Sequence, residues 1–469
     1  MTKACKIIVS IFVLPLLLVP FYSCNTAKQY HRPDIITDSV YYNVKPGDSS
    51  NIALITWQNI FSDTSLKNLI GAGIENNLDL KIAIRRIDEA EAFLRQKGGE
   101  LLPDLNVETT SGITRLSDNS VKGLTDNKPV ANYRVGLSSS WEIDLWGKLR
   151  SAKRSAYADL LKTEAIKRSV QTKLIADIAT EYYNLLLFNS QQKIIELTIR
   201  NREEDLETVK LMKTAALLTE AAVKQSEAQV YAARILLPKL KTQINISSNA
   251  INIFLGKMPS KIESGDLDDS PQLIIDTLTG YPAQLLVNRP DVFASEQSLI
   301  ASFENTNVAR ANFYPSLIIT AGLGLESFDL GKLFLFPGSI FANSLGQLVQ
   351  PIFDKRKNKS ELEAAFARQQ IEAYNFRNTF LTAAQEVSNA LYNYKISGEI
   401  IFLYSKQTEA LELALEYSQE LLKSGFANYV EVLRAEDELL NSRLEYLKAR
   451  TDQLQSGVEL YRALGGGWR

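Results

Sequence analysis

Four segments of the chain alternate apolar and polar residues with the period of two that a β-strand has. The clearest runs from Ala131 to Asp144, where one face is apolar with an aromatic residue near each end and the other face is polar. The other three are Asp104–Leu116, Leu317–Glu326 and Ile340–Ile352, and the last of them has the weakest pattern. A strand between lipid and water shows this alternation, and so does a soluble sheet with one buried face. The pattern therefore predicts four strands and leaves both environments open.

Two other segments predict helices far longer than usual. No proline or glycine occurs from Lys148 to Met212, and only Gly398 interrupts the stretch from Lys355 to Lys423. At 1.5 Å per residue these helices would measure about 90 to 105 Å, whereas the mean helix has about 11 or 12 residues. Helices of this length do not pack around one compact core.

Each long helix has a partner in the sequence whose residues repeat every seven positions. The partners are Thr219–Leu255 and Asn428–Leu464. The repeating positions are Val223, Val230, Leu237, Ile244 and Ile251 in the first, and Val432, Leu439, Tyr446, Gln453 and Leu460 in the second. This spacing predicts coiled-coil-like packing with a left-handed supercoil. Pro238 lies inside the first partner, where we expect a kink. Two further helices are expected over Trp57–Asn76 and Asp79–Gly99.

The two parts of the chain resemble each other. Asp79–Val107 aligns without a gap on Asp291–Ile319, and Ala216–Gly256 aligns without a gap on Gly425–Gly465. Two long alignments at nearly equal shifts predict a duplicated chain, each half being helix, strand, strand, long helix, helix. The expected segments are an extended leader at 24–60, a first repeat at 61–265 and a second repeat at 266–469.

Four strands are too few to close a membrane barrel, since the smallest such barrels have about eight. Open strand edges cannot face lipid, because their backbone polar groups would lack partners there. If these strands meet lipid, several copies of the chain must combine.

Composition removes several classes of function. The 469 residues include 52 Lys+Arg and 54 Asp+Glu, so a net charge of -2 argues against a nucleic-acid binder. One histidine, His31, and two cysteines, Cys5 and Cys24, exclude most metal sites and histidine-dependent catalysis. We expect no catalytic residues, no metal and no cofactor. Gly465–Gly467 is interpreted as a helix terminator, and the acid pairs Glu203–Glu204 and Glu436–Asp437 as solvated helix faces.

The N-terminus has the order of a secretory signal peptide. Lys3 and Lys6 precede an uncharged run from Ile7 to Pro20, and Ser23 precedes Cys24. This resembles a bacterial lipoprotein signal, which implies removal of residues 1–23 and lipid attachment at Cys24. Each buried CH₂ of an acyl chain adds about 0.8 kcal/mol of membrane affinity. The alternatives are an uncleaved anchor helix or cleavage elsewhere, because Phe21 and Tyr22 are bulkier than such signals usually show.

Seven stretches of the sequence resemble outer-membrane efflux proteins of the TolC/OprM type, in the NodT-like lipoprotein branch that serves resistance-nodulation-division (RND) pumps. They are WQNIFSDTSLKNLIGAGIENNLDLKIAIRRIDEAEA at Trp57–Ala92, WEIDLWGKLR at Trp141–Arg150, NRPDV at Asn288–Val292, ARANFYPSL at Ala309–Leu317, QPIFD at Gln350–Asp354, GFANYVEVLRAEDELL at Gly425–Leu440 and ALGGGW at Ala463–Trp468. The resemblance covers essentially the whole chain after the signal. It implies a mostly helical fold with membrane β-strands: a homotrimer whose twelve strands form one outer-membrane barrel, continued by a periplasmic α-helical tunnel.

The resemblance also implies roles for particular residues. The turns at Lys213–Thr219 and Ser424–Asn428 would form the periplasmic tip, which docks an adaptor protein and closes the resting channel. Glu431 matches an acidic residue that lines the constriction, while a second acidic position of some relatives is Arg434 here. The expected adaptor contacts are Leu217, Leu218, Gly425 and Phe426. The alternatives are that these apolar residues staple the turns and that Glu431 is an ordinary salt-bridged residue. Lys355 and Arg356 replace glycines that usually follow the QPIFD motif.

These observations predict a passive exit duct of a tripartite efflux pump, which is not an enzyme. The duct would lie in the outer membrane, anchored by lipid, with a long periplasmic extension that contacts an adaptor and an inner-membrane RND pump. A type I secretion duct is the nearest rival, although the lipoprotein signal favours efflux. A periplasmic coiled-coil lipoprotein scaffold with a small soluble sheet is the structural alternative. An enzyme is the reading with the least support.

Overall fold

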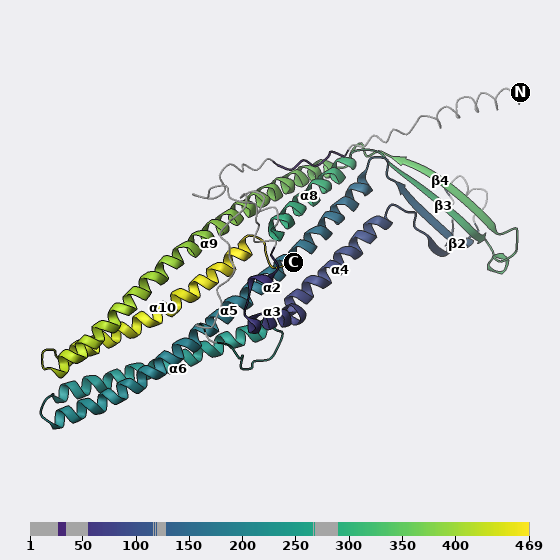
Figure 1. Cartoon of the computed structure of the whole chain (residues 1–469). Coiled ribbons are helices and arrows are strands. Elements are labelled where there is room, and N and C mark those ends of the chain that lie inside the picture. The colour runs from purple at the N-terminus through teal and green to yellow at the C-terminus, as the bar shows by residue number, and fades with distance from the viewer. Residues whose placement is uncertain are drawn as a thin grey trace, which may run out of the picture. The chain divides into compact units, whose positions relative to one another are not determined.

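A computed structural model describes residues 27–33, 55–115, 117, 119, 128–265, 267 and 289–468 (Figure 1). The expected signal peptide and Cys24 lie outside the described residues. Contacts divide the chain into two units, each built from segments of both halves of the sequence. The first unit includes residues 88–161 and 296–374, and the second includes residues 162–295 and 375–469. The proposed boundary at 265/266 stays a prediction about the repeats.

The first unit contains one antiparallel sheet with the strand order β1-β2-β3-β4. The strands are β1 (Asn106–Thr114), β2 (Val130–Ile143), β3 (Ser316–Ser327) and β4 (Ile340–Val349). All four predicted strands are therefore present, with ends shifted by at most three residues. A short 3₁₀ turn, η2 (Leu330–Lys332), lies between β3 and β4.

The strand register places the predicted apolar faces on one side of the sheet. Leu137 pairs with Leu323 and Trp141 pairs with Ile319, and paired residues of neighbouring strands point to the same face. Many of the large side chains on this face are exposed. Its large exposed side chains are Val107, Ile113, Leu137, Trp141, Ile319, Leu323 and Leu348. A soluble sheet buries its apolar face, so the exposure favours contact with lipid.

The opposite face of the sheet is mostly polar, although Phe341 and Leu345 of β4 also lie on it. Ser138 donates a hydrogen bond to Glu108 at 2.8 Å, and Asn132 donates one to Glu326 at 3.0 Å. The Arg134 guanidinium lies 4.0 Å from the ring centroid of Phe341. Charged and amide groups on this face are thus held by cross-strand partners, as the alternation predicts for a face turned to water.

The helices repeat in length as well as in order. They are α4 (Leu78–Gly99) and α8 (Pro290–Ala311), each of 22 residues; α5 (Lys148–Thr214) and α9 (Lys357–Lys423), each of 67; and α6 (Glu220–Phe254) and α10 (Tyr429–Ala463), each of 35. The long pairs start 209 positions apart and the short pair 212. These equal lengths agree with the duplication inferred from the sequence.

The heptad positions form the contact surface of the second helix in each hairpin. Val223, Val230 and Ile251 are buried in α6, and Val432, Leu439 and Leu460 are buried in α10. The other heptad positions are half-buried. Side-chain packing along this seven-residue repeat therefore holds the two helices of each hairpin together. Helix propensity alone would not fix their register. Helix α6 continues through Pro238.

The predicted helix Trp57–Asn76 is wrong as one element. It is two helices, α2 (Trp57–Ile60) and α3 (Thr64–Asn76), and α2 falls inside the expected extended leader. Asp63 separates them because its carboxylate accepts the backbone N–H groups of Ser65 and Leu66, which caps α3. Asn77 likewise caps the next helix by accepting the N–H of Leu80 at 2.9 Å.

Buried Arg289, from the NRPDV stretch, joins three helices of the second unit. It bonds Asp291 at the start of α8, Glu386 of α9 and the Ala463 carbonyl oxygen at the end of α10. Burial alone would raise the pKa of Asp291, but the Arg289 pair overcomes this and lowers it. The glycine run that follows α10 ends the helix as expected, since Gly465 has φ 86° and the Gly466 N–H donates to the Tyr461 carbonyl.

Close strand approach requires glycine at one point in the sheet. Gly136 pairs with Gly324, and a Cβ on Gly324 would collide with the Gly136 Cα and the Val135 carbonyl oxygen. The Phe341 ring lies against the same pair of glycines. We therefore expect Gly324→Ala to destabilise the folded chain by about 1 to 3 kcal/mol, as overpacking does. Thermal unfolding in detergent measures this. Gly346→Ala in β4 is the matched control, because a Cβ there meets nothing within 4 Å; equal melting temperatures for the two variants would contradict the prediction.

Candidate functional site

The two helical hairpins end in turns with the same backbone conformation. In the α5–α6 turn the Leu217 N–H donates to the Met212 carbonyl at 2.9 Å, and Ala216 has φ 59°. In the α9–α10 turn the Phe426 N–H donates to the Leu421 carbonyl at 2.9 Å, and Gly425 has φ 77°. Each is a Schellman motif, which needs a left-handed residue that glycine adopts most easily. Both predicted turns therefore lie at hairpin ends, and the sequence alignment of Ala216 with Gly425 matches their conformations.

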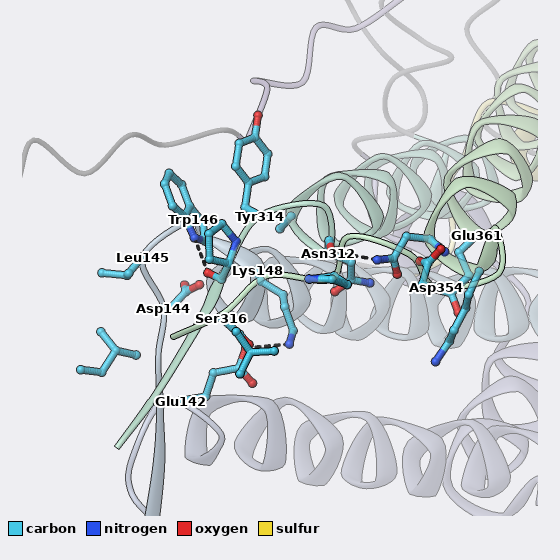
Figure 2. A pocket seen from close by; sticks show the side chains of 17 residues that line it. Glu142, Asp144, Leu145, Trp146, Lys148, Asn312, Tyr314, Ser316, Asp354 and Glu361 are labelled. Carbon is cyan, nitrogen blue, oxygen red and sulfur yellow. Dashed lines mark hydrogen bonds and ion pairs between the residues drawn. The ribbon is translucent and has the colours of Figure 1, made fainter. Parts of the chain in front are cut away.

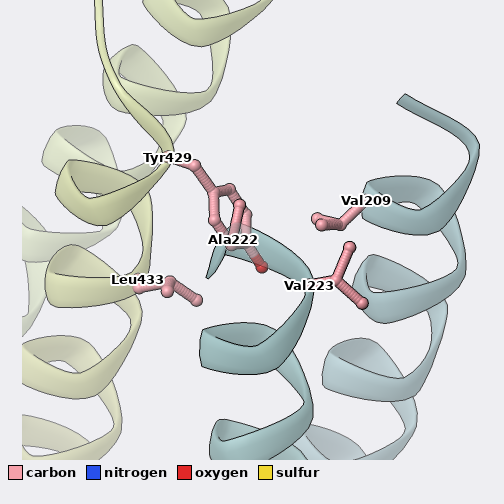
Figure 3. Packing of buried hydrophobic residues seen from close by; sticks show 5 residues of the cluster. All are labelled: Val209, Ala222, Val223, Tyr429 and Leu433. Carbon is pink, nitrogen blue, oxygen red and sulfur yellow. The ribbon is translucent and has the colours of Figure 1, made fainter. Parts of the chain in front are cut away.

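The two hairpin ends pack on each other through an apolar cluster (Figure 3). Its buried members are Val209, Ala222, Val223, Tyr429 and Leu433, drawn from α5, α6 and α10. Leu206, Leu218 and Leu422 cover it. The ends of the hairpins are thus one packed structure, and a change in this cluster acts on both.

The four candidate adaptor contacts separate into two groups. Leu217 is 70% exposed and Phe426 is 84% exposed, and each follows the left-handed residue of its turn. Gly425 is exposed with them. Leu218 instead packs against the apolar cluster, which is the stapling role given as its alternative. The exposed residues of the two turns are available to a partner, while Leu218 supports the turn.

Glu431 lies in the first turn of α10 and is exposed. Its backbone N–H donates to the side chain of the N-cap residue Asn428 at 3.2 Å. Arg434, one turn further along, pairs with Glu438 at 2.9 Å. The structure therefore brings Glu431 to the same end of the hairpin as the exposed turn residues.

A polar cluster that the sequence did not predict lies behind the apolar one. Arg202 of α5 is 5% exposed and bonds Asp437 of α10, and its Nη1 donates to Gln229 of α6 at 3.0 and 3.1 Å. Gln229 in turn donates to Asp437 at 2.9 Å. This network joins the two hairpins through one buried cation.

The interpretation of Glu436 as a solvated residue is wrong. Burial, followed by the charge of Asp205, raises the pKa of Glu436 to about 7. A signal for this was present in the sequence, because Glu436 lies four residues after the buried Val432 and three before the buried Leu439. These spacings place all three on one helix face. Glu203, by contrast, pairs with Arg234 at an exposed position, as expected for a solvated face.

A polar cavity of about 400 Å³ lies in the first unit where strands turn into helices (Figure 2). Asp144 caps α5 by accepting the N–H groups of Leu149 and Arg150, and Asp354 caps α9 by accepting the Asn358 N–H. Figure 2 shows Trp146 beside Tyr314, and their rings stack with centroids 4.9 Å apart. The Trp146 Nε1–H donates to the Pro315 carbonyl at 2.7 Å. Stacking and capping fix the chain direction at this corner.

The unusual residues Lys355 and Arg356 both have left-handed backbones, with φ 57° and 68°. Gly147, with φ 79°, immediately precedes α5 as Arg356 immediately precedes α9. Glycine adopts this conformation freely, whereas other residues are destabilised there by about 1 to 2 kcal/mol each. The corner therefore keeps the geometry that glycine favours despite its two basic side chains.

Within the described residues, no group of three or more His, Cys, Asp or Glu side chains could hold a metal ion. In the same part of the chain, no helix has the length and apolar character needed to cross a membrane.

Packing in the apolar cluster yields a testable difference between two tip residues. Leu433 is 7% exposed, so Leu433→Ala leaves a cavity and should destabilise the hairpin ends by about 2 to 5 kcal/mol. Phe426→Ala removes an exposed side chain and should change stability by less than about 0.5 kcal/mol. Limited proteolysis of the turns measures the difference, with faster cleavage expected only for Leu433→Ala. Equal cleavage rates for both variants would show that the cluster does not hold the tip.

Comparison with known proteins agrees with this architecture. The family model described as "Outer membrane efflux protein" matches residues 69–257 and 281–466. The solvent efflux pump outer membrane protein SrpC of Pseudomonas putida is 32% identical over 431 residues, covering 90% of each chain. The cation efflux system protein CusC of Escherichia coli is 27% identical over 464 residues, covering 97% of this chain and 99% of CusC.

Solved structures show the same fold. The open state of the MtrE outer membrane channel of Neisseria gonorrhoeae superposes with a TM-score of 0.85 at 25% identity, covering 95% of this chain and 99% of MtrE. The predicted fold class, long helices with four membrane-type strands per chain, is confirmed. On its fold, its exposed apolar sheet face and these matches, the chain belongs to the outer membrane efflux protein family and is an outer-membrane channel component.

Proposed function

We propose that three copies of this chain close one barrel of twelve strands and form the exit duct of a tripartite efflux pump. The observation that carries the proposal is the sheet: one face is exposed and apolar, and among the described residues β1 and β4 each pair along one edge only. In lipid the unpaired N–H and C=O groups of those edges need partners. Neighbouring copies supply them when β4 of one chain pairs with β1 of the next, which removes every edge.

The efflux role is supported by the relatives, whose names refer to efflux of solvents and of cations. Such different cargoes on one architecture fit a duct that conducts what a pump delivers. A type I secretion duct has no comparable support among them. We therefore assign the selection of substrate to an inner-membrane pump of the RND class and not to this chain.

Docking of a periplasmic adaptor is assigned to the exposed residues of the two turns. Leu217, Gly425 and Phe426 are the surface that the hairpin ends present, and Leu218 orders that surface from behind. Exposed apolar side chains at the tip give a partner helix an apolar surface to contact. Cys24 is assigned as the acylated first residue that anchors the mature chain to the outer membrane.

Glu431 is assigned to the constriction of the resting duct. It is exposed at the hairpin end, and three copies brought to one axis would crowd three carboxylates at a narrow neck. Such a ring attracts cations and repels anions. The working cycle follows: the adaptor and pump engage the tip, the hairpin ends part, and the neck widens.

The membrane role is tested with two adjacent residues of β2. Leu137 lies on the apolar face and Ser138 on the polar face. Leu137→Arg should destabilise insertion by about 2 to 4 kcal/mol if its site is at the bilayer midplane, because its charge would face lipid. Ser138→Arg should insert and form channels, since its charge would face water. Folding into vesicles and current across planar bilayers measure both outcomes. A scaffold protein would give no current in any form, and equal insertion of the two variants would refute the assignment of the faces.

The constriction is tested with Glu431→Ala. Loss of three carboxylates at the neck should reduce cation selectivity, seen as a shift of the reversal potential in a salt gradient. Glu420→Ala is the matched control, because Glu420 is an exposed carboxylate near the end of α9 that pairs with Lys423 at 2.7 Å. Unchanged selectivity in Glu431→Ala, or an equal change in the control, would remove Glu431 from the constriction.

A further inference from the structure

Two carboxyl groups from different hairpins meet inside the second unit. Asp205 projects from α5 and Glu436 from α10 into the same space between the two hairpins. They line a cavity of about 230 Å³ together with buried Arg202. Two carboxyl groups can share a hydrogen bond only if one of them carries a proton. A single proton on this pair therefore allows a hydrogen bond between the two groups, and its loss leaves two carboxylates that repel each other.

The surroundings cannot neutralise both carboxylates. Arg202 is already bonded to Asp437 through Nη2 and to Gln229 through Nη1. Its Nε–H, which is buried, has no hydrogen-bond partner within the described structure. One cation thus faces three carboxyl groups, of Asp205, Glu436 and Asp437, so full ionisation leaves two uncompensated negative charges beside the cavity.

The other groups around the pair do not change this balance. Helices α6 and α9 contribute uncharged residues, namely Gln229, Ser226, Leu415 and Gln419. Helix α5 contributes Glu204, and helix α10 contributes Tyr429 and Arg443. Arg443 is paired with Glu412 of α9 at 2.6 Å. Burial raises the pKa of Tyr429, so it stays neutral at any physiological pH. Among the residues that the structure describes, the other charged groups at this cavity are thus Glu204, a further carboxylate, and Arg443, which already has a partner.

We propose that Asp205 and Glu436 form a proton-operated latch between the α5–α6 and α9–α10 hairpins. With one shared proton the pair holds the hairpins together, and without it the two carboxylates repel each other across the joint. The latch regulates the tip described above, so its effect on conduction rests on the proposed channel function. The site binds a proton, and binding of this proton favours the state in which the two hairpins are packed against each other.

The direction of the pH dependence follows from the shift at Glu436. Its pKa rises from the ordinary value of 4.5 to about 7 in the packed state, chiefly through burial. Parting the hairpins exposes the carboxyl to water and returns its pKa toward 4.5. Between these values the packed state holds a proton that the parted state releases, so packing is favoured at the acidic end and weakens as pH rises toward 7. One proton changes the ratio of parted to packed forms by up to about tenfold per pH unit in this window.

The latch is tested by single-channel recording of the full-length protein in planar bilayers from pH 5 to pH 8.5. In the wild type, open probability should rise with pH and level off above about 7. Glu436→Gln should give a low open probability that does not vary over this range, because its amide still donates a hydrogen bond to Asp205 and cannot ionise. Asp205→Asn should shift the rise to lower pH, since Glu436 then loses its repelling neighbour. Glu438→Gln is the matched control: this exposed residue two positions away should leave the wild-type profile unchanged.

The outcomes separate the latch from the channel. A wild-type pH profile in Glu436→Gln, or a flat profile in the wild type with normal current, would overturn the latch and leave the duct intact. No current from any form at any pH would overturn the duct itself. Infrared spectra supply a reading independent of conduction, because a protonated carboxyl band should be present at pH 6 in the wild type and absent in Glu436→Gln. A band that persists in Glu436→Gln would also refute the latch.

Discussion

Backbone polar groups cannot remain unpaired in hydrocarbon, and this constraint organises the whole molecule. A sheet of four strands exposes a continuous apolar face and leaves an edge at β1 and another at β4. Lipid covers the apolar side chains of the face, but the backbone N–H and C=O groups of the two edges need other strands as hydrogen-bond partners. A single chain of this kind is therefore incomplete in lipid, and this is the physical basis of the proposed assembly of copies.

The duplication explains why the same helix lengths and the same turn conformation occur in both halves of the chain. Both hairpins have helices of 67 and 35 residues, and both turns use one Schellman motif. The two halves differ at positions where the backbone has a left-handed conformation. Ala216 stands where the other half has Gly425, and Arg356 precedes α9 as Gly147 precedes α5. Packing around the turns and corners thus maintains the left-handed conformation even where the residue is not glycine.

Polar contacts also connect the two hairpins behind their ends. Buried Arg202 joins α5, α6 and α10, and the carboxyl pair beside it adds a proton-dependent contact. Buried charges are costly to separate from their partners but easily unbalanced by one proton. A contact between the hairpins that is made of buried charges is stable when the charges balance and weakens when they do not. The apolar cluster of Figure 3, by contrast, responds little to pH.

The periodic elements could be predicted from the amino-acid sequence, because alternation and heptad spacing report directly which side of a strand or helix avoids water. The sequence predicted the four strands, the long helices, their seams and the turns. It did not predict the break before Asp63, where a cap outweighs the helical pattern, nor the burial of Glu436. Those depend on which hydrogen-bond donors and charges other segments bring near. Two outcomes emerged only from the folded chain: Leu218 supports the turn while Phe426 is exposed, and Asp205 of one hairpin lines the same cavity as Glu436 of the other. Both are set by contacts between residues far apart in the chain.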